Sequence, residues 1–303
     1  MSSLKPLALV SHDAGGAEMI SSWALQNPRD YVCVAEGPAL QIFNRKLAGN
    51  LFLTLDEALE ICDSIICGTS WQSDLERLAI VRACSLGKHV AVFFDHWTDF
   101  KDRLLLNGEC IYPSEIWVAD DYALKLARDC FDSIPIKLKG NPYLKEIEKQ
   151  IMSMITLNDD KQLPHKGAVL YLGENFNSAS IRHGDGYWGY RDEDAVKFFL
   201  ENIGTVVNEV NTISIRPHPS EEQDKYEWVK EINPLVSSVS SNRLLLEDIL
   251  EAEIVAGCES MALVVALMAK KTVISCIPPG GRNCGLPHTE LLHLGDLISN
   301  HRR

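Results

Sequence analysis

The stretch DSIICGTSWQSDLERLAIVRACSLGKHVAVFFDH, from Asp63 to His96, contains a complete strand–helix–strand unit. The runs SIIC and VAVFF have the short apolar character of strands, and SDLERLAIVRACSLG between them has a helical pattern. A strand that is apolar at every position is buried on both faces, which favours a parallel sheet covered by helices over a β-sandwich. We therefore expect an α/β fold.

The same alternation continues on both sides of this unit. Strand-like runs precede it as PLALVSH, DYVCVAE and NLFLTL, and they follow it as EIWVAD and IKLKGN. A long helical segment, PYLKEIEKQIMSMITL, and the polar segment NDDKQLPHKG then interrupt the pattern before strands resume at GAVLYLGE. We expect two Rossmann-like domains that face each other across a cleft, at residues 1–157 and 158–303.

The composition narrows the class of protein. The chain has 303 residues, of which 46% are hydrophobic and 23% charged, as in a soluble globular enzyme. Its net charge of -13 argues against sustained nucleic-acid contact, which depends on neutralising phosphates. No run approaches the roughly 20 apolar residues of a membrane span. We expect a cytoplasmic protein with no transmembrane segment, and peripheral association with a membrane stays open.

Nine cysteines are scattered through the chain without CxxC spacing. This odd count without pairing suggests reduced, buried thiols and no zinc site. We expect no metal among the site residues.

The first candidate site follows the first strand, in SHDAGGAE. Asp13 stands where a strand gives way to a helix, and Gly15 and Gly16 allow the backbone to turn closely. From that position the carboxylate could take a proton from an attacking hydroxyl. The alternative is that Asp13 caps the following helix.

A second candidate group follows the strand VAVFF. Asp95, His96 and Trp97 form an expected acceptor site, in which the tryptophan offers a flat face to a sugar ring. Alternatively, His96 is a hydrogen-bonding histidine of the core. Asp102 and Arg103, a few residues later, are ordinary surface charges in the same alternative.

The segment IRPHPSEE, from residue 215 to 222, ends a strand in the second domain. His218 is held between two prolines at the edge where open α/β sheets bind ligands. Arg216, two residues earlier, is expected on the same side, so both can contact a phosphate. The alternative is a histidine packed on the domain surface.

The segment GCESMALVVAL, from residue 257 to 267, ends another strand and opens an apolar helix. Ser260 and Met261 begin that helix, whose unpaired amides make an anion site, and Glu259 could accept from a ribose hydroxyl. N-capping by Ser260 is an alternative that does not exclude phosphate binding. A long loop at 174–194 adds further ligand candidates, which are Arg182, His183 and Tyr187. The segment PPGGRNCGLPH, at 278–288, could close over a donor.

These motifs together resemble bacterial GT-B glycosyltransferases that use CMP-activated nonulosonic acids, the sialyltransferases and the pseudaminic, legionaminic and Kdo transferases. The resemblance implies that Asp13 is the general base, that His218 of RPHP assists the leaving group, and that Ser260 binds the phosphate. The chain departs from the family pattern in two places: the paired acids before glycine appear as DAG, and the serine pair appears as Ser260-Met261. RPHP also resembles polyol-phosphate transferases of teichoic-acid type, and GCESMAL resembles UDP-sugar 2-epimerases.

The resemblance implies an inverting, metal-independent glycosyltransferase of GT-B type. It would move an acidic sugar, nonulosonic or Kdo-like, from its CMP form to a surface glycan, glycolipid or protein acceptor, with no cofactor besides the nucleotide sugar. Two alternatives stay open, a UDP-sugar 2-epimerase and a catalytically silent protein that binds a sugar nucleotide in a glycan assembly complex.

Overall fold

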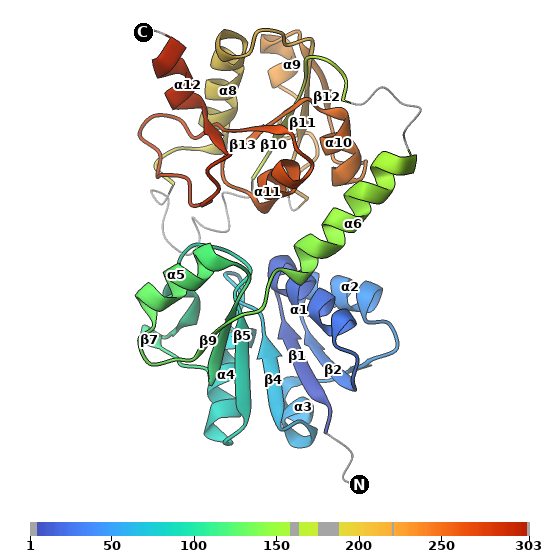
Figure 1. Cartoon of the computed structure of the whole chain (residues 1–303), viewed down its shortest axis with the longest axis vertical. Helices are drawn as coiled ribbons and strands as arrows, with labels where there is room; N and C mark the ends of the chain where they lie inside the picture. The colour runs from blue at the N-terminus through green and yellow to red at the C-terminus, as the bar shows by residue number, and fades with distance from the viewer. Residues whose placement is uncertain (1–4, 158–163, 175–187, 220, 302–303) are drawn as a thin grey trace. The chain divides into compact units, whose positions relative to one another are not determined.

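The computed structural model describes residues 5–157, 164–174, 188–219 and 221–301 (Figure 1). The chain divides into two compact units, Met1–Glu146 and Ile147–Arg303. The division falls inside α6 (Pro142–Leu157), the long helix that the sequence predicts before the polar segment. Each unit is described by itself.

The first unit alternates strands and helices from its first strand onward. Its elements are β1 (Leu7–Ser11), α1 (Ala14–Gln26), β2 (Tyr31–Ala35), α2 (Gly37–Lys46), β3 (Leu51–Phe52), α3 (Leu55–Ile61), β4 (Ser64–Cys67), α4 (Leu75–Ser85), β5 (His89–Phe93), the 3-10 helix η1 (Asp102–Leu104), β6 (Leu105–Leu106), β7 (Glu109–Cys110), β8 (Glu115–Val118), α5 (Asp121–Cys130) and β9 (Ile136–Leu138).

The main sheet of this unit has seven parallel strands in the order β3-β2-β1-β4-β5-β8-β9. All five residues of β1 are buried. Helices α1 and α4 both pack against β1, β4 and β5. Leu7 and Leu9 join Met19 and Ile20 of α1 in one core cluster. The apolar strand runs thus come from a sheet covered on both faces, as the sequence predicts.

The second unit repeats this plan. Its elements are β10 (Ala168–Leu172), α8 (Asp192–Val206), β11 (Thr212–Arg216), α9 (Val229–Ile232), β12 (Val236–Val239), α10 (Leu245–Glu251), β13 (Ile254–Gly257), α11 (Met261–Met268), β14 (Thr272–Ser275), β15 (Leu292–His293) and α12 (Leu294–His301). Six parallel strands follow the order β12-β11-β10-β13-β14-β15. The core of this unit includes Tyr171 and Phe199, whose ring centroids lie 4.9 Å apart.

The two sheets share one doubly wound strand order, in which the first strand of each unit pairs with the second and the fourth. Strand β1 lies between β2 and β4, and β10 lies between β11 and β13. In open sheets of this kind, ligands bind beyond the carboxyl ends of the strands at the point where the order reverses. We therefore expect ligand-binding residues in the loops after β1 and β4 and after β10 and β13. Within the described ranges, no helix combines the length and apolar character of a membrane span.

Candidate functional site

The carboxyl edge of the first sheet holds Asp13 in a net of three donors. The Asp13 Oδ1 atom accepts from the Ser70 hydroxyl at 2.8 Å and lies 2.7 Å from His12 Nδ1. The Oδ2 atom accepts from the Trp71 amide at 2.9 Å. Asp13 precedes α1 but makes no side-chain capping bond to it. The capping alternative is therefore wrong, because the loop after β4 takes this carboxylate.

Gly15 and Gly16 are required by close packing at the same edge. A Cβ added to Gly15 would lie 2.0 Å from Asp95 Oδ2, and one added to Gly16 would lie 3.1 Å from the Gly68 Cα. The expected close turn of the backbone therefore serves to bring the start of α1 against Asp95 and the loop after β4.

Asp95 lies at the end of β5 among polar groups. Its Oδ1 atom accepts from the Thr69 hydroxyl at 3.1 Å and lies 3.5 Å from Arg103 Nη1. Burial raises the pKa of the Asp95 carboxyl, against the lowering effect of the guanidinium. Arg103 is 7% exposed and lies over the Trp71 ring, so the alternative of an ordinary surface charge is wrong at this position.

The two aromatic members of the predicted acceptor group, His96 and Trp97, lie with their ring centroids 5.6 Å apart but differ in burial. Trp97 is 4% exposed, and its indole N–H donates to Asp120 Oδ2 at 2.8 Å. This burial is at odds with a flat face offered to a sugar, because the ring is part of the core. His96 is only partly buried, with Nδ1 3.3 Å from the Thr98 hydroxyl oxygen. His96 stays a candidate for ligand contact.

Glu76 lies in the first turn of α4 and contacts the residue that precedes Asp13. It is 2% exposed, and its Oε1 atom accepts from the His12 amide at 2.7 Å. The Oε2 atom is buried and has no hydrogen-bond partner among the residues that the structure describes. Burial raises the pKa of Glu76 to about 7, and the charge of Asp13 adds to the rise.

The corresponding edge of the second sheet is occupied by one of the protein's own carboxylates. Glu174, just after β10, accepts three amide hydrogens on Oε1, from Cys258 at 2.9 Å, Glu259 at 2.5 Å and Ser260 at 2.8 Å. These amides precede α11, where the sequence predicts a phosphate. A helix N-terminus offers unpaired amides to an acceptor, and here the acceptor is a side chain of the protein itself. Burial raises the pKa of Glu174 to about 7.

The two residues next to this helix start differ in their contacts. Glu259 accepts from Arg282 Nη2 at 2.9 Å on one oxygen and from the Gly285 amide at 2.9 Å on the other. Glu259 thereby fixes the segment at 278–288. Because both of its oxygens already accept hydrogen bonds, this pairing is at odds with a ribose contact. Ser260 makes no capping bond, and its buried Oγ has no partner in the described part of the chain. Met261 opens α11 and is partly exposed.

His218 and Arg216 have different surroundings after β11. Burial lowers the pKa of the His218 imidazole, so the ring is neutral near pH 7 and can donate one N–H without carrying charge. Arg216 Nη1 donates to Asp248 Oδ2 at 2.6 Å and to the Arg243 carbonyl at 2.9 Å. The expectation that Arg216 serves a phosphate is at odds with this pairing, because its charge is already matched by α10.

The other predicted ligand candidates, Arg182, His183 and Tyr187, lie outside the described residues. Over the described ranges, no group of three or more His, Cys, Asp or Glu residues is arranged to hold a metal ion. Independence of metal stays a prediction.

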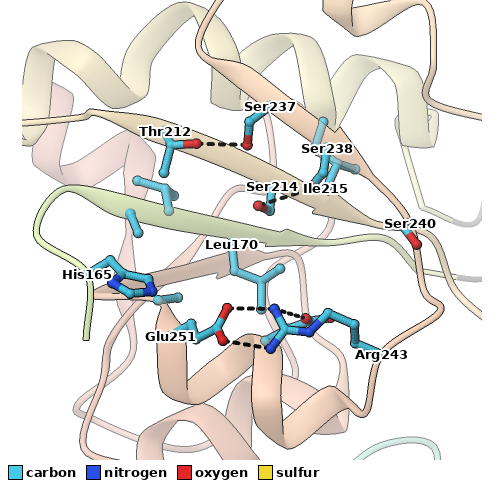
Figure 2. Close-up of a pocket in the computed structure, with 14 residues that line it drawn as sticks. His165, Leu170, Thr212, Ser214, Ile215, Ser237, Ser238, Ser240, Arg243 and Glu251 are labelled. Atoms are coloured by element: carbon cyan, nitrogen blue, oxygen red, sulfur yellow. Dashed lines mark hydrogen bonds and ion pairs between the residues drawn. The ribbon is translucent and has the colours of Figure 1, made fainter. Parts of the chain in front are cut away.

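A pocket of about 240 Å³ lies on the face of the second sheet (Figure 2). Its hydroxyl groups pair with one another, Thr212 with Ser237 at 2.8 Å and Ser214 with Ser238 at 3.1 Å. On the opposite wall, Arg243 donates twice to the Glu251 carboxylate, as Figure 2 shows. Since these hydroxyl and charged groups already have partners and the pocket lies on the sheet face, we assign it no part in the candidate site.

Sequence reasoning missed residues of two kinds. Thr69, Ser70 and Trp71 follow β4, so the rule that identified Asp13 and Asp95 at strand ends applied to them as well. Glu174 follows β10 and could have been found in the same way. Glu76 gave no signal, because an acid in the first turn of a helix is explained by the helix dipole.

No protein-family model matches the sequence, and no curated protein matches it in sequence. Solved structures do match. The UDP-GlcNAc 2-epimerase from Methanocaldococcus jannaschii has a TM-score of 0.62 at 14% identity, covering 98% of this chain and 92% of the epimerase chain. Its complex with UDP-GlcNAc and UDP has a TM-score of 0.60 at 12% identity, with 98% and 91% covered.

A variant of the wall teichoic acid polymerase TagF has a TM-score of 0.50 at 11% identity, covering 99% of this chain and 79% of that one. Identities this low show the fold alone. The predicted α/β class, with two Rossmann-like units of the GT-B type, is confirmed.

Proposed function

We propose that this protein is a glycosyltransferase that uses a sugar nucleotide. The observation that best supports this proposal is the hydrogen bonding of Asp13. At the ligand edge of the first sheet its carboxylate contacts three donors, and it makes no capping bond to α1. A carboxylate fixed in this way beside an imidazole is suited to promoting proton removal from an acceptor hydroxyl. Asp13 and its neighbours would thus serve the acceptor, which is a glycan, glycolipid or protein.

The donor side of the proposal rests on the edge of the second sheet. Ser260 offers a hydroxyl without a partner among the described residues, and neutral His218 offers an N–H to the departing phosphate. Glu174 occupies the amides before α11, so a donor phosphate must replace its carboxylate or bind beside it. The resemblance of RPHP and the Ser260 segment favours a CMP-linked acidic sugar as donor.

A second candidate is a UDP-sugar 2-epimerase, favoured by one observation. Asp13 and Asp95 lie at the same sheet edge, and burial raises the pKa of the Asp95 carboxyl. A carboxyl group that holds its proton in this way, beside a second carboxylate, is suited to the acid–base chemistry that proton abstraction at a sugar carbon would need. An epimerase requires UDP rather than CMP, so the nucleotide distinguishes the two proposals.

Thermal unfolding of the full chain with CMP, CDP, UDP or GDP tests the donor. We expect CMP or CDP to stabilise most, since a ligand at 100 times its dissociation constant adds about 2.7 kcal/mol to the folding free energy. A clear preference for UDP would move the proposal to the epimerase. Absence of stabilisation by all four nucleotides would contradict both enzymes.

Ser260→Ala supplies a matched variant for this panel. The hydroxyl has no partner in the described part of the chain, so its removal should leave the unfolding temperature without nucleotide nearly unchanged. It should weaken the stabilisation by CMP, because one donor to the phosphate is lost. Ser299→Ala, on the exposed face of α12, should change neither quantity.

A further inference from the structure

The hydrogen bonds of Asp13 assign it a supporting position. Its two oxygens already contact the Ser70 hydroxyl, the Trp71 amide and His12 Nδ1. Each donor occupies a lone pair of the carboxylate that would otherwise be open to an acceptor hydroxyl. The Oδ1 atom, which contacts two of these groups, is a poor acceptor for a third, and Oδ2 already accepts from the Trp71 amide. A different atom of this group is better placed to receive a proton.

That atom belongs to His12. Because an ionised carboxylate only accepts hydrogen bonds, the 2.7 Å contact with Asp13 places the hydrogen of a neutral imidazole on Nδ1. The lone pair then lies on Nε2. The side chain is 16% exposed, and no hydrogen bond from a described residue reaches Nε2. The ring is thus oriented through Nδ1, while Nε2 keeps a lone pair that no described residue uses in a hydrogen bond.

The backbone around His12 is also held on both sides. Its amide donates to Glu76 Oε1 at 2.7 Å, and its carbonyl accepts from the Ala39 amide at 3.0 Å. Gly37 has a φ of +51°, and a Cβ added there would lie 2.6 Å from Nε2. A side chain at position 37 would therefore displace the ring. Gly37 leaves the space in which the imidazole lies.

We propose that His12 Nε2 is the base that deprotonates the acceptor, and that Asp13 and Glu76 are its positioning residues. This inference rests on the proposed glycosyl transfer. It replaces Asp13 as the base while keeping Asp13 essential, because only a carboxylate at that position selects the tautomer with a free Nε2.

The transfer step balances with His12 in this role. The acceptor hydroxyl gives its proton to Nε2 as its oxygen forms a bond to the anomeric carbon of the sugar. The bond from that carbon to the phosphate oxygen breaks, and its electron pair leaves with the nucleotide. The imidazolium beside Asp13 then releases the proton to solvent. Asp13 contacts the ring at Nδ1, and Glu76 accepts from the amide of the same residue, so both hold the imidazole in place during the transfer.

The tautomer can be tested without any substrate. Long-range ¹H–¹⁵N correlation spectra of the full chain, with ¹⁵N-labelled histidine and His12→Gln to assign the signal, report which nitrogen carries hydrogen. We expect neutral His12 to carry hydrogen on Nδ1. Hydrogen on Nε2 would overturn the proposal, since no lone pair would face the acceptor.

Asp13→Asn should reverse the tautomer for a specific reason. The Trp71 amide must still donate to the oxygen of residue 13, which turns the new NH₂ group toward His12. The imidazole then accepts on Nδ1 and carries its hydrogen on Nε2. A spectrum unchanged by Asp13→Asn would contradict the positioning role. Thermal unfolding of each variant shows that the fold is retained.

Turnover provides the second test, with CMP release from CMP-N-acetylneuraminate as the probe and water as acceptor. We expect His12→Ala to release CMP about 10² to 10⁴ times more slowly, and added imidazole to restore part of the rate. Imidazole should not rescue Asp13→Ala. Full activity in His12→Ala would overturn the proposal. If the unaltered protein releases no CMP, the proposed transferase fails with this donor, whereas the spectra still decide the state of His12.

Discussion

Replacing Glu174 with glutamine should make the free energy of unfolding of the protein less dependent on pH. Glutamine keeps the size of the side chain and an oxygen that accepts from the amides of Cys258, Glu259 and Ser260. It removes the negative charge. Any change in the pH dependence of unfolding can therefore be attributed to the ionisation of Glu174.

The magnitude follows from the pKa in the folded protein. Burial raises the pKa of Glu174 from an ordinary 4.5 to about 7, although the three amides act in the opposite direction. A group whose pKa is raised on folding favours the folded state while it is protonated, and this contribution is lost as pH rises from 4.5 through 7. At 1.36 kcal/mol per pKa unit, the loss is about 3 kcal/mol.

Urea unfolding of the full chain at several pH values between 4.5 and 8 measures this effect. We expect the free energy of unfolding of the unaltered protein to fall by about 3 kcal/mol more than that of Glu174→Gln over this range. Glu201→Gln, at an exposed position of α8, is the matched control and should follow the unaltered protein. Parallel curves for Glu174→Gln and the unaltered protein would refute the buried, ionisable carboxylate at this helix start.

Three further substitutions test the roles of individual contacts. Gly15→Ala places a methyl group within 2.0 Å of Asp95 Oδ2, so we expect transfer to fall at least about tenfold while circular dichroism shows a folded protein; unchanged transfer would remove Asp95 from the site. Trp97→Phe loses the bond to Asp120 and should lower the unfolding free energy by about 1–2 kcal/mol without changing the KM for acceptor, whereas a raised KM with unchanged stability would restore the stacking role. Arg216→Met removes the closer of the two guanidinium groups beside Asp248 and should lower the unfolding free energy by about 1–3 kcal/mol, and calorimetry should find CMP binding unchanged unless the guanidinium contacts the phosphate.

The sheets could be predicted because burial on both faces leaves a direct mark on the sequence. The run VAVFF at β5 has no polar position, and the four strand residues that follow His89 are all buried in the fold. The strand ends were then located by where such runs stop. This is why Asp13 and Asp95 were found, since each follows a buried strand at the ligand edge.

The partners of these residues could not be predicted in the same way. The donors to Asp13 from Ser70 and Trp71 are 57 and 58 residues away in the chain. Glu174 and Ser260 are 86 residues apart. A helix start with unpaired amides predicts an anion, but sequence spacing does not say whether a ligand or a distant side chain supplies it. The local alternatives, capping by Asp13 and by Ser260, were both wrong for this reason.

The most direct test of the proposed function is ³¹P NMR of the protein with CMP-N-acetylneuraminate, with and without a mixture of candidate glycan acceptors. Transfer converts the phosphodiester signal of the donor into the phosphomonoester signal of free CMP. We predict that CMP forms, that acceptor accelerates its formation, and that His12→Ala slows it about 10² to 10⁴-fold. A donor signal that persists unchanged, alongside conversion of UDP-GlcNAc to its 2-epimer by the same preparation, would contradict the transferase and establish the epimerase.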